Sequence, residues 1–209
     1  MTFGVEQAKR WISKFNDKIQ EQKEYLTELD QAIGDGDHGL NMARGVQEAV
    51  NKITPVDYGE LGSLFKDVGM TLIAKVGGAS GPLYGTVFMK ASLALKDKKE
   101  VDGKELVEAL AASLDGLKAR GKAQVGDKTM IDVWEPVIEL LRNSQAIQLE
   151  QLLSVSKEKM EYTKELEAKK GRAAYLGKRS IGHIDPGAAS SYLLFASLAE
   201  VFAEGESVS

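Results

Sequence analysis

The chain has 209 residues, no cysteine, and 27 basic against 31 acidic side chains, which give a formal charge of −4. The absence of cysteine excludes disulfides, thiolate nucleophiles and cysteine-ligated metals. The mixed charges argue against nucleic acid as a ligand. The sequence contains no apolar run of about 18 residues that could span a bilayer. Because no linker rich in Pro, Gly or Ser divides the chain, we expect one cytoplasmic domain over residues 1–209, with no membrane partner.

Apolar residues recur three and four positions apart along most of the chain, which predicts amphipathic helices. In chain order these stripes run over residues 5–29, 40–50, 61–73, 83–91, 106–117, 133–141, 149–167 and 186–202. The stripe over 149–167 is more polar than the others, so we expect that helix to bury only a narrow edge. Alternating runs of β-branched residues are absent from the sequence, which argues against a parallel sheet. The sequence therefore predicts an all-α fold of about eight helices.

The glycines gather in four connections between these helices rather than inside them. The connections read LDQAIGDGDHGLNMARG at 29–45, VGGASGPLYG at 76–85, RGKAQVGDKT at 120–129 and GRAAYLGKRSIGHIDPGAAS at 171–190. Glycine lets a ligand approach the backbone, and a helix N-terminus supplies free N–H groups and a partial positive charge, which together suit phosphate. Each connection alone also fits an ordinary capping turn. For all four together we favour phosphate-binding loops that meet at one end of a helical bundle.

Three aspartates, Asp30, Asp35 and Asp37, stand within eight residues of the first connection. Asp30 falls in the last turn of the first helix, where the helix dipole disfavours a carboxylate by up to about 1 kcal/mol, so we expect it to have a compensating partner. Asp35 and Asp37 are two apart and point the same way in an extended loop, as ligands of a hard cation such as magnesium would. The alternative is that Asp37 caps the next helix while Asp35 stabilises the turn, which leaves Asp30 unexplained.

Short nucleotide- and calcium-binding motifs do not fit this sequence. Counting an EF-hand from Asp35 places Val46 where the bidentate glutamate belongs. The stretch GKAQVGDKT at 121–129 is close to a P-loop, but Asp127 occupies the lysine position and the preceding residues predict a helix instead of a strand. Protein-kinase signatures are also absent from the sequence. If the chain binds a nucleotide, it uses another fold.

Four blocks in order resemble the nucleotide-binding L subunit of dihydroxyacetone kinases. They read LDQAIGDGDHGLNMARG, GMTLIAKVGGASGPLYGTVF, RGKAQVGDKTMIDVWEPV and KKGRAAYLGKRSIGHIDPGAASS. With the helices between them they cover nearly the whole chain. The chain is similar to the ADP-binding subunit of the enzyme that depends on the phosphotransferase system, because 209 residues leave no room for a fused dihydroxyacetone-binding domain.

This resemblance implies a barrel of eight antiparallel helices that holds ADP or ATP and two magnesium ions in the loops at one end. It implies that Asp30, Asp35 and Asp37 bind both ions. It also implies that the nucleotide contacts His38, Gly39, Leu40, Asn41, Gly78, Ala79, Ser80, Gly81, Gly121, Thr129, Met130, Arg179, Asp185, Pro186 and Gly187. Within this set, Ala79 and Ser80 would face the phosphates. Lys178 and Arg172 are alternatives to Arg179.

In the mechanism that the resemblance implies, bound ADP accepts a phosphoryl group from a phosphohistidine protein of the phosphotransferase system. It then passes the group to dihydroxyacetone on a separate subunit. A transcription regulator is a further contact in the family, and a homodimer is an open possibility. Such a reaction requires that charge on the transferring phosphoryl group is neutralised while donor and acceptor are held in line. This agrees with a sequence that contains carboxylates and helix N-termini and no obvious nucleophile.

Two other functions stay open from the sequence. The chain fits an ATP-dependent kinase subunit that acts on dihydroxyacetone or on another substrate, such as a fatty acid, and it also fits a non-catalytic nucleotide-sensing regulatory module. His38 or His183 could carry a phosphoryl group itself. Because each histidine lies beside a glycine in a predicted nucleotide loop, we favour a hydrogen-bonding or packing role for both. Trp134 is predicted to belong to the core, and Met130 either to the core or to the adenine site.

Overall fold

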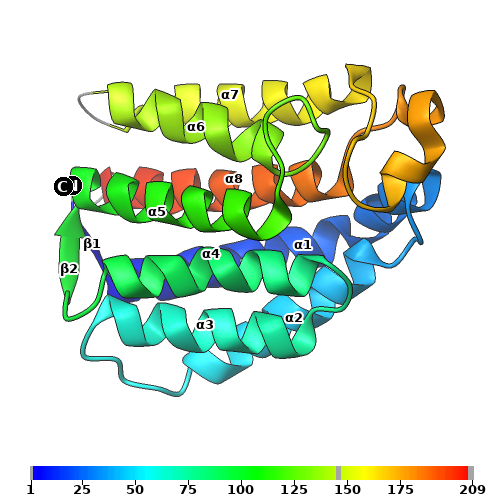
Figure 1. Cartoon of the computed structure of the whole chain (residues 1–209). Coiled ribbons are helices and arrows are strands. Elements are labelled where there is room, and N and C mark those ends of the chain that lie inside the picture. Colours follow the sequence, from blue (N-terminus) through cyan, green and yellow to red (C-terminus); the bar gives the residue numbers. More distant parts are fainter. Residues whose placement is uncertain (1, 145–146, 207–209) are drawn as a thin grey trace.

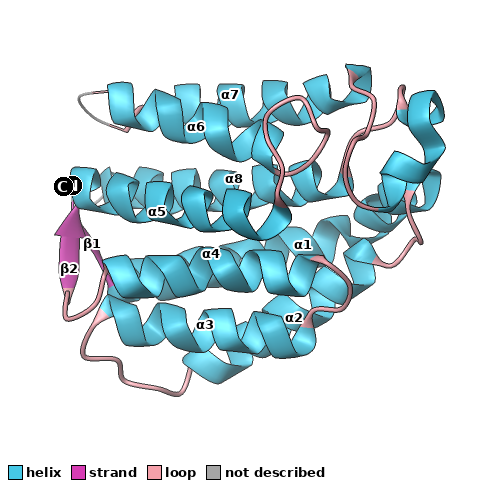
Figure 2. Ribbon diagram, viewed as in Figure 1, coloured by secondary structure: helices cyan, strands magenta, loops and turns pink. Residues whose placement is uncertain are grey.

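The structure is a computed structural model that describes residues 2–144 and 147–206. It contains eight α-helices: α1 (Val5–Ile33), α2 (His38–Ile53), α3 (Leu61–Lys75), α4 (Ser80–Ala94), α5 (Gly103–Gly121), α6 (Ile131–Asn143), α7 (Leu149–Tyr162) and α8 (Pro186–Glu206). Figure 2 shows that helix dominates the described chain. The prediction of an all-α fold is confirmed.

A short sheet joins the N-terminus to the connection before α5, and the sequence did not predict it. Strand β1 (Thr2–Gly4) pairs antiparallel with β2 (Glu100–Asp102), with Phe3 opposite Val101. Both of these side chains are buried, whereas their neighbours on the strands are more exposed. Strands are predicted from alternating apolar and polar residues, and three residues are too few to show this alternation.

The eight helices form a closed ring. Each helix packs against the next one in the chain, and α8 returns to pack against α1. Neighbouring helices run in opposite directions (Figure 1), so the N-termini of α2, α4, α6 and α8 all lie at the same end of the ring. This arrangement confirms the predicted antiparallel barrel, and it brings the glycine-rich connections together.

The interior of the ring is a continuous apolar core to which all eight helices contribute. Trp11 of α1 packs against Phe65 and Phe88, with ring centroids 6.0 and 5.9 Å away. On the other side, Trp134 packs edge-on against Phe195 at 4.8 Å and is fully buried, as predicted for a core residue. Burying such a side chain contributes about 1.5–3 kcal/mol, so the predicted stripes are what hold the ring closed.

The connection from α7 to α8, residues 163–185, is an ordered strap and not part of a helix that runs to 167. Helix α7 ends at Tyr162, and two 3-10 segments follow, η1 (Thr163–Glu165) and η2 (Arg172–Ser180). The buried Thr163 stops the helix because its hydroxyl donates to the Met160 carbonyl and accepts from the Asp185 N–H. A small second core of Ile33, Ala168 and Ala173, with Leu176 against it, fastens the strap to the end of α1.

Candidate functional site

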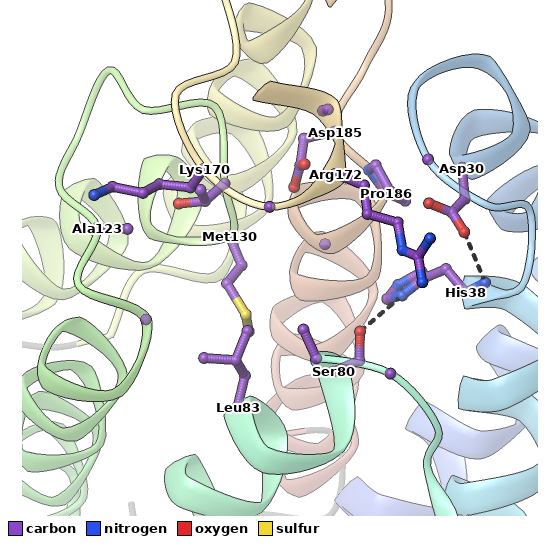
Figure 3. A pocket seen from close by; sticks show the side chains of 18 of the residues that line it. Asp30, His38, Ser80, Leu83, Ala123, Met130, Lys170, Arg172, Asp185 and Pro186 are labelled. Atoms are coloured by element: carbon purple, nitrogen blue, oxygen red, sulfur yellow. Dashed lines mark hydrogen bonds between the residues drawn. The ribbon is translucent and has the colours of Figure 1, made fainter. Parts of the chain in front are cut away.

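A cavity of about 550 Å³ lies at the end of the ring where the four helix N-termini meet. Its wall comes from the end of α1, the first residues of α2, α4, α6 and α8, the connection after α5, and the strap (Figure 3). This volume lies within the usual range for small-molecule and cofactor sites. The four connections that the sequence singled out therefore meet at one cavity.

The three predicted metal ligands lie together on one side of this cavity. Asp30, Asp35 and Asp37 each offer a carboxylate oxygen, and these oxygens lie within 4.8 Å of one another. Asp30 is buried, and the other two lie nearer to solvent. A set of carboxylate oxygens open to water suits a hard, partly hydrated cation such as magnesium better than zinc.

Asp30 has the compensating partner that its position demands. Its Oδ2 accepts hydrogen bonds from the backbone N–H groups of Asp37 (2.8 Å) and His38 (3.1 Å), so the last turn of α1 caps the start of α2. Asp37 stands at the N-cap position, but among the described residues its side chain makes no capping hydrogen bond. Its backbone is already helical (φ −117°, ψ −7°), whereas a capping side chain needs an extended backbone. The interpretation of Asp37 as a helix cap is therefore wrong, and its carboxylate is available to the cavity.

Helix α4 presents free backbone donors to the cavity, unlike the other three helices. Asp30 caps α2, the Thr129 hydroxyl accepts from the Ile131 N–H at 3.2 Å in α6, and the Asp185 carboxylate accepts from the Ala188 N–H at 2.8 Å in α8. Within residues 2–144 and 147–206, α4 has no side-chain cap, and the N–H groups of 78–80 make no hydrogen bond. Free N–H groups at a helix N-terminus are a ready-made phosphate site.

His38 lies buried between two serines. Its Nδ1 is 3.0 Å from the Ser80 hydroxyl and its Nε2 is 2.9 Å from the Ser190 hydroxyl. Burial lowers the pKa of His38 to about 4, in spite of the opposing charges of Asp30 and Asp37. The ring is therefore neutral at physiological pH, and both nitrogens are engaged, which agrees with a hydrogen-bonding role. His183 is exposed and is not among the described residues that line the cavity.

An arginine from the strap reaches the acidic side of the cavity. The Nη2 of Arg172 is 3.0 Å from the Oδ2 of Asp35, and Figure 3 shows the guanidinium pointing toward Asp30 and His38. Both partners are well exposed, so this ion pair stabilises the fold by only about 0–1 kcal/mol. Arg172, Lys170 and Arg120 line the cavity, whereas Arg179 is not among the described lining residues. The geometry thus favours Arg172 over Arg179 as the arginine of the predicted nucleotide site, one of the two alternatives to Arg179 that the sequence left open.

Apolar side chains also line the cavity, away from Asp30 and His38 (Figure 3). Leu83, Leu117, Ala123, Met130 and Ile131 line it, and Met130 points toward Leu83 in Figure 3. Met130 is only 5% exposed, so it belongs to the core and also borders the cavity. The cavity therefore offers an apolar surface as well as charged groups, which suits a ligand with one flat ring system and one anionic end.

Most of the predicted nucleotide residues line the cavity. These are His38, Gly78, Ala79, Ser80, Gly121, Thr129, Met130, Asp185, Pro186 and Gly187. Five others are not among the described lining residues: Arg179, Gly39, Leu40, Asn41 and Gly81. Gly39 faces α1, where an added Cβ would lie 1.9 Å from the Lys23 carbonyl oxygen, Gly81 packs against the Val76 carbonyl, and Leu40 is 57% exposed. Asn41 is buried beneath Gly77, and its Oδ1 accepts from Arg44.

Lys128 is a buried lysine that lines the cavity and was not predicted from the sequence. It is 1% exposed, its backbone has φ +61°, and its Nζ donates to the carbonyls of Thr163 and His183. Burial lowers the pKa of Lys128. The side chain joins the connection after α5 to the strap. Asp132 supports the same connection, since its carboxylate accepts from the N–H groups of Gly126 (2.6 Å) and Thr129 (2.7 Å).

Comparison with known proteins identifies the family. Residues 32–200 match the model of the DAK2 domain. The chain belongs to the DAK2 domain family. The "PEP-dependent dihydroxyacetone kinase 1, ADP-binding subunit DhaL" of Listeria innocua is 49% identical over 93% of this chain and 96% of its own length. The corresponding Escherichia coli subunit is 43% identical, over 95% and 98%. The resemblance that the four blocks indicated is confirmed, and these relatives are named as kinases, which are phosphotransferases.

A solved DAK2 relative shares this fold. The dihydroxyacetone kinase of C. freundii, in complex with AMP-PNP and Mg2+, superposes with a TM-score of 0.78 at 26% identity. The alignment covers 96% of this chain and 34% of that one. In the described part of this DAK2 chain, no helix has the length and apolar character needed to cross a membrane.

Asp185, which precedes α8, makes stability depend on pH. Burial raises the pKa of Asp185 to about 7; the Ala188 N–H and Lys128 oppose this rise, and Asp132 and Asp30 add to it. A carboxyl whose pKa is higher in the folded chain binds its proton more tightly there. Its contribution to stability is therefore fully present below about pH 4 and is lost as the pH rises through about 7.

We expect Asp185→Asn to remove this loss. Between pH 5 and pH 8 the free energy of unfolding of the variant should rise relative to wild type by about 1–2 kcal/mol, because the amide stays neutral and still accepts from Ala188. Urea unfolding with chelator and without nucleotide measures the difference. The titration of His38 occurs in both proteins and cancels. Equal pH slopes for the two proteins would contradict the raised pKa.

Proposed function

We propose that the chain is the ADP-binding subunit of a phosphoenolpyruvate- and phosphotransferase-dependent dihydroxyacetone kinase. One observation carries the proposal: the uncapped N-terminus of α4 and the three carboxylates of Asp30, Asp35 and Asp37 border the same cavity. Free N–H groups suit phosphate, carboxylates suit magnesium, and nucleotide phosphates bind both. The names of the Listeria and Escherichia coli relatives support ADP as the nucleotide, and the C. freundii kinase supports magnesium.

The residues of the cavity divide the work of binding. Asp30, Asp35 and Asp37 would hold two magnesium ions, whose charge offsets the repulsion among the three carboxylates. The N–H groups of 78–80 would bind the phosphates from the side of α4. The apolar wall around Met130 and Leu83 would hold the adenine ring, with Gly121 allowing close approach. Asp30, Asp35 and Asp37 each offer a carboxylate oxygen, and such donors fit magnesium.

Binding of magnesium would also free Arg172. In the absence of an ion, Arg172 neutralises Asp35, and an ion at Asp35 would displace the guanidinium toward the phosphates. There the arginine could neutralise charge on the transferring group. His38 has no free lone pair for attack on phosphorus, because Ser80 and Ser190 engage both nitrogens. The chain therefore contributes alignment and charge and forms no covalent intermediate of its own.

Two partner proteins complete the proposed reaction. Bound ADP would accept a phosphoryl group from a phosphohistidine donor and deliver it to dihydroxyacetone held by a separate subunit. The word "subunit" in the names of the relatives supports this division of labour. The proposal also includes contact with a transcription regulator, association with a second copy of the chain, and a cytoplasmic location. One alternative has its own support: the C. freundii kinase was solved with AMP-PNP, an ATP analogue, so direct use of ATP is the competing mechanism.

Neutralising Asp35 should weaken ADP binding. We expect Asp35→Asn to lower the affinity for ADP in the presence of Mg2+ at least about tenfold, and chelation of Mg2+ to have a similar effect on wild type, because phosphate and carboxylates then lose their shared cation. Isothermal titration calorimetry measures both effects. Asp57→Asn is the matched control, since Asp57 is an exposed carboxylate outside this cavity. Unchanged affinity in Asp35→Asn would remove Asp35 from the metal site.

Retention of ADP separates the two mechanisms. The phosphotransferase-dependent mechanism predicts that ADP stays bound through gel filtration and becomes phosphorylated in place when the phosphohistidine donor is added. Mass spectrometry of the protein before and after the donor step detects both states. If bound nucleotide instead exchanged freely with labelled ATP, and ATP alone supported transfer to dihydroxyacetone, the ATP-dependent mechanism would replace our proposal.

A further inference from the structure

A buried line of hydrogen bonds runs from the cavity into the centre of the ring. Its members, which we call the buried polar chain, are Ser80, His38, Ser190, Tyr84, Ser191 and Trp134. The first two distances, from His38 to the serines, are given above. From Ser190 the line continues to the Tyr84 hydroxyl at 2.7 Å, then to Ser191 at 3.3 Å and to Trp134 at 3.2 Å. Its members belong to α2, α4, α6 and α8, whose N-termini surround the cavity.

The buried polar chain lies in a dry environment. Tyr84, Ser190, Ser191 and Trp134 are each 0% exposed and sit among the apolar side chains of the core. Polar groups in such a place destabilise the fold unless each one finds a partner. Among the described residues no fully buried polar side-chain atom lacks one.

One direction of donation satisfies every hydrogen bond of the line, including the contact from Ser190 to the Gly187 carbonyl. The indole N–H of Trp134 can only donate, so Ser191 accepts from it and can pass its own hydrogen to Tyr84. Burial raises the pKa of Tyr84 to about 12, so the phenol keeps its hydrogen and can donate it to Ser190. The Ser190 hydroxyl in turn donates to the Gly187 carbonyl at 3.1 Å. Ser190 has then used its one hydrogen and accepts from both Tyr84 and His38.

This direction determines which nitrogen of His38 carries the hydrogen. If Ser190 accepts from His38, the hydrogen is on Nε2. An imidazole with its single hydrogen on Nε2 has a bare Nδ1, so Ser80 donates its hydroxyl hydrogen to Nδ1.

We propose that Tyr84 and Ser190 are positioning residues, which hold His38 as the Nε2–H tautomer and thereby make the Ser80 hydroxyl an acceptor toward the cavity. The Ser80 hydrogen is committed to His38, so the remaining lone pairs face the cavity, beside backbone N–H groups that only donate. Ser80 then takes a cation or its bound water, whereas the neighbouring N–H groups take phosphate oxygens. This assignment of Ser80 rests on the proposed function, but the tautomer of His38 does not.

The tautomer can be read directly. The chain has two histidines, so a long-range 15N–1H correlation spectrum of nucleotide-free, metal-free protein shows only two ring systems. We expect the His38 ring to be protonated at Nε2 in wild type. In Tyr84→Phe, Ser190 loses the donor that holds its hydroxyl at Gly187, so its hydrogen can turn to His38 and the Nδ1–H tautomer should become populated. Protonation at Nδ1 in wild type, or an unchanged ring in Tyr84→Phe, would overturn the inference.

The affinity for ADP tests whether Ser80 depends on the buried polar chain. Loss of one hydrogen bond in the line should weaken binding of ADP with Mg2+ about fivefold in Tyr84→Phe. Ser197→Ala is the matched control, because Ser197 is a fully buried α8 serine that lies outside the buried polar chain and whose hydroxyl donates to the Leu193 carbonyl of its own helix. If Tyr84→Phe weakened binding no more than Ser197→Ala, Ser80 would not depend on the line. Failure of wild type to bind ADP would count against the proposed function and leave the NMR result to decide the tautomer.

Discussion

The convergence of four helix N-termini at one end of the ring is the constraint on which the rest of the structure depends. An antiparallel ring of eight helices places α2, α4, α6 and α8 with their positive ends together. The free N–H groups there must be satisfied by side chains, water or a ligand. Carboxylates and a hydroxyl of the chain accept from the N-terminal N–H groups of α2, α6 and α8. Helix α4 has no such side-chain cap, so its N–H groups are available to a ligand.

The acidic residues of the site follow from this constraint. Asp30 is unfavourable at the end of α1, and it becomes favourable by accepting the first N–H groups of α2. Asp185 does the same for α8, but burial raises its pKa to about 7, so it is only partly ionised near that pH. Asp35 and Asp37 have no such backbone role among the described contacts. The chain therefore separates carboxylates that support helix ends from carboxylates that remain available for the proposed cation, and Asp30 belongs to both groups.

The sequence predicted those features that depend on local spacing. Apolar stripes identified the helices because each stripe is the buried face of one helix, and the crowded aspartates indicated the proposed metal site because their repulsion needs a counter-charge. Three features lay beyond local spacing. The two strands are too short to show alternation, and the bends of η2 depend on Gly171 and Gly177 at positive φ. Lys128 is buried only because carbonyls 35 and 55 residues further along the chain come to meet it.

The central claim is that α4 binds phosphate through its free backbone N–H groups. Amide chemical shifts of 15N-labelled protein, recorded with Mg2+ and then with ADP or adenosine, test it most directly. The account predicts that the amide signals of Gly78, Ala79 and Ser80 shift with ADP and stay in place with adenosine, while signals near Met130 respond to both. Large ADP-specific shifts elsewhere in the ring, with these three amides unmoved, would contradict it.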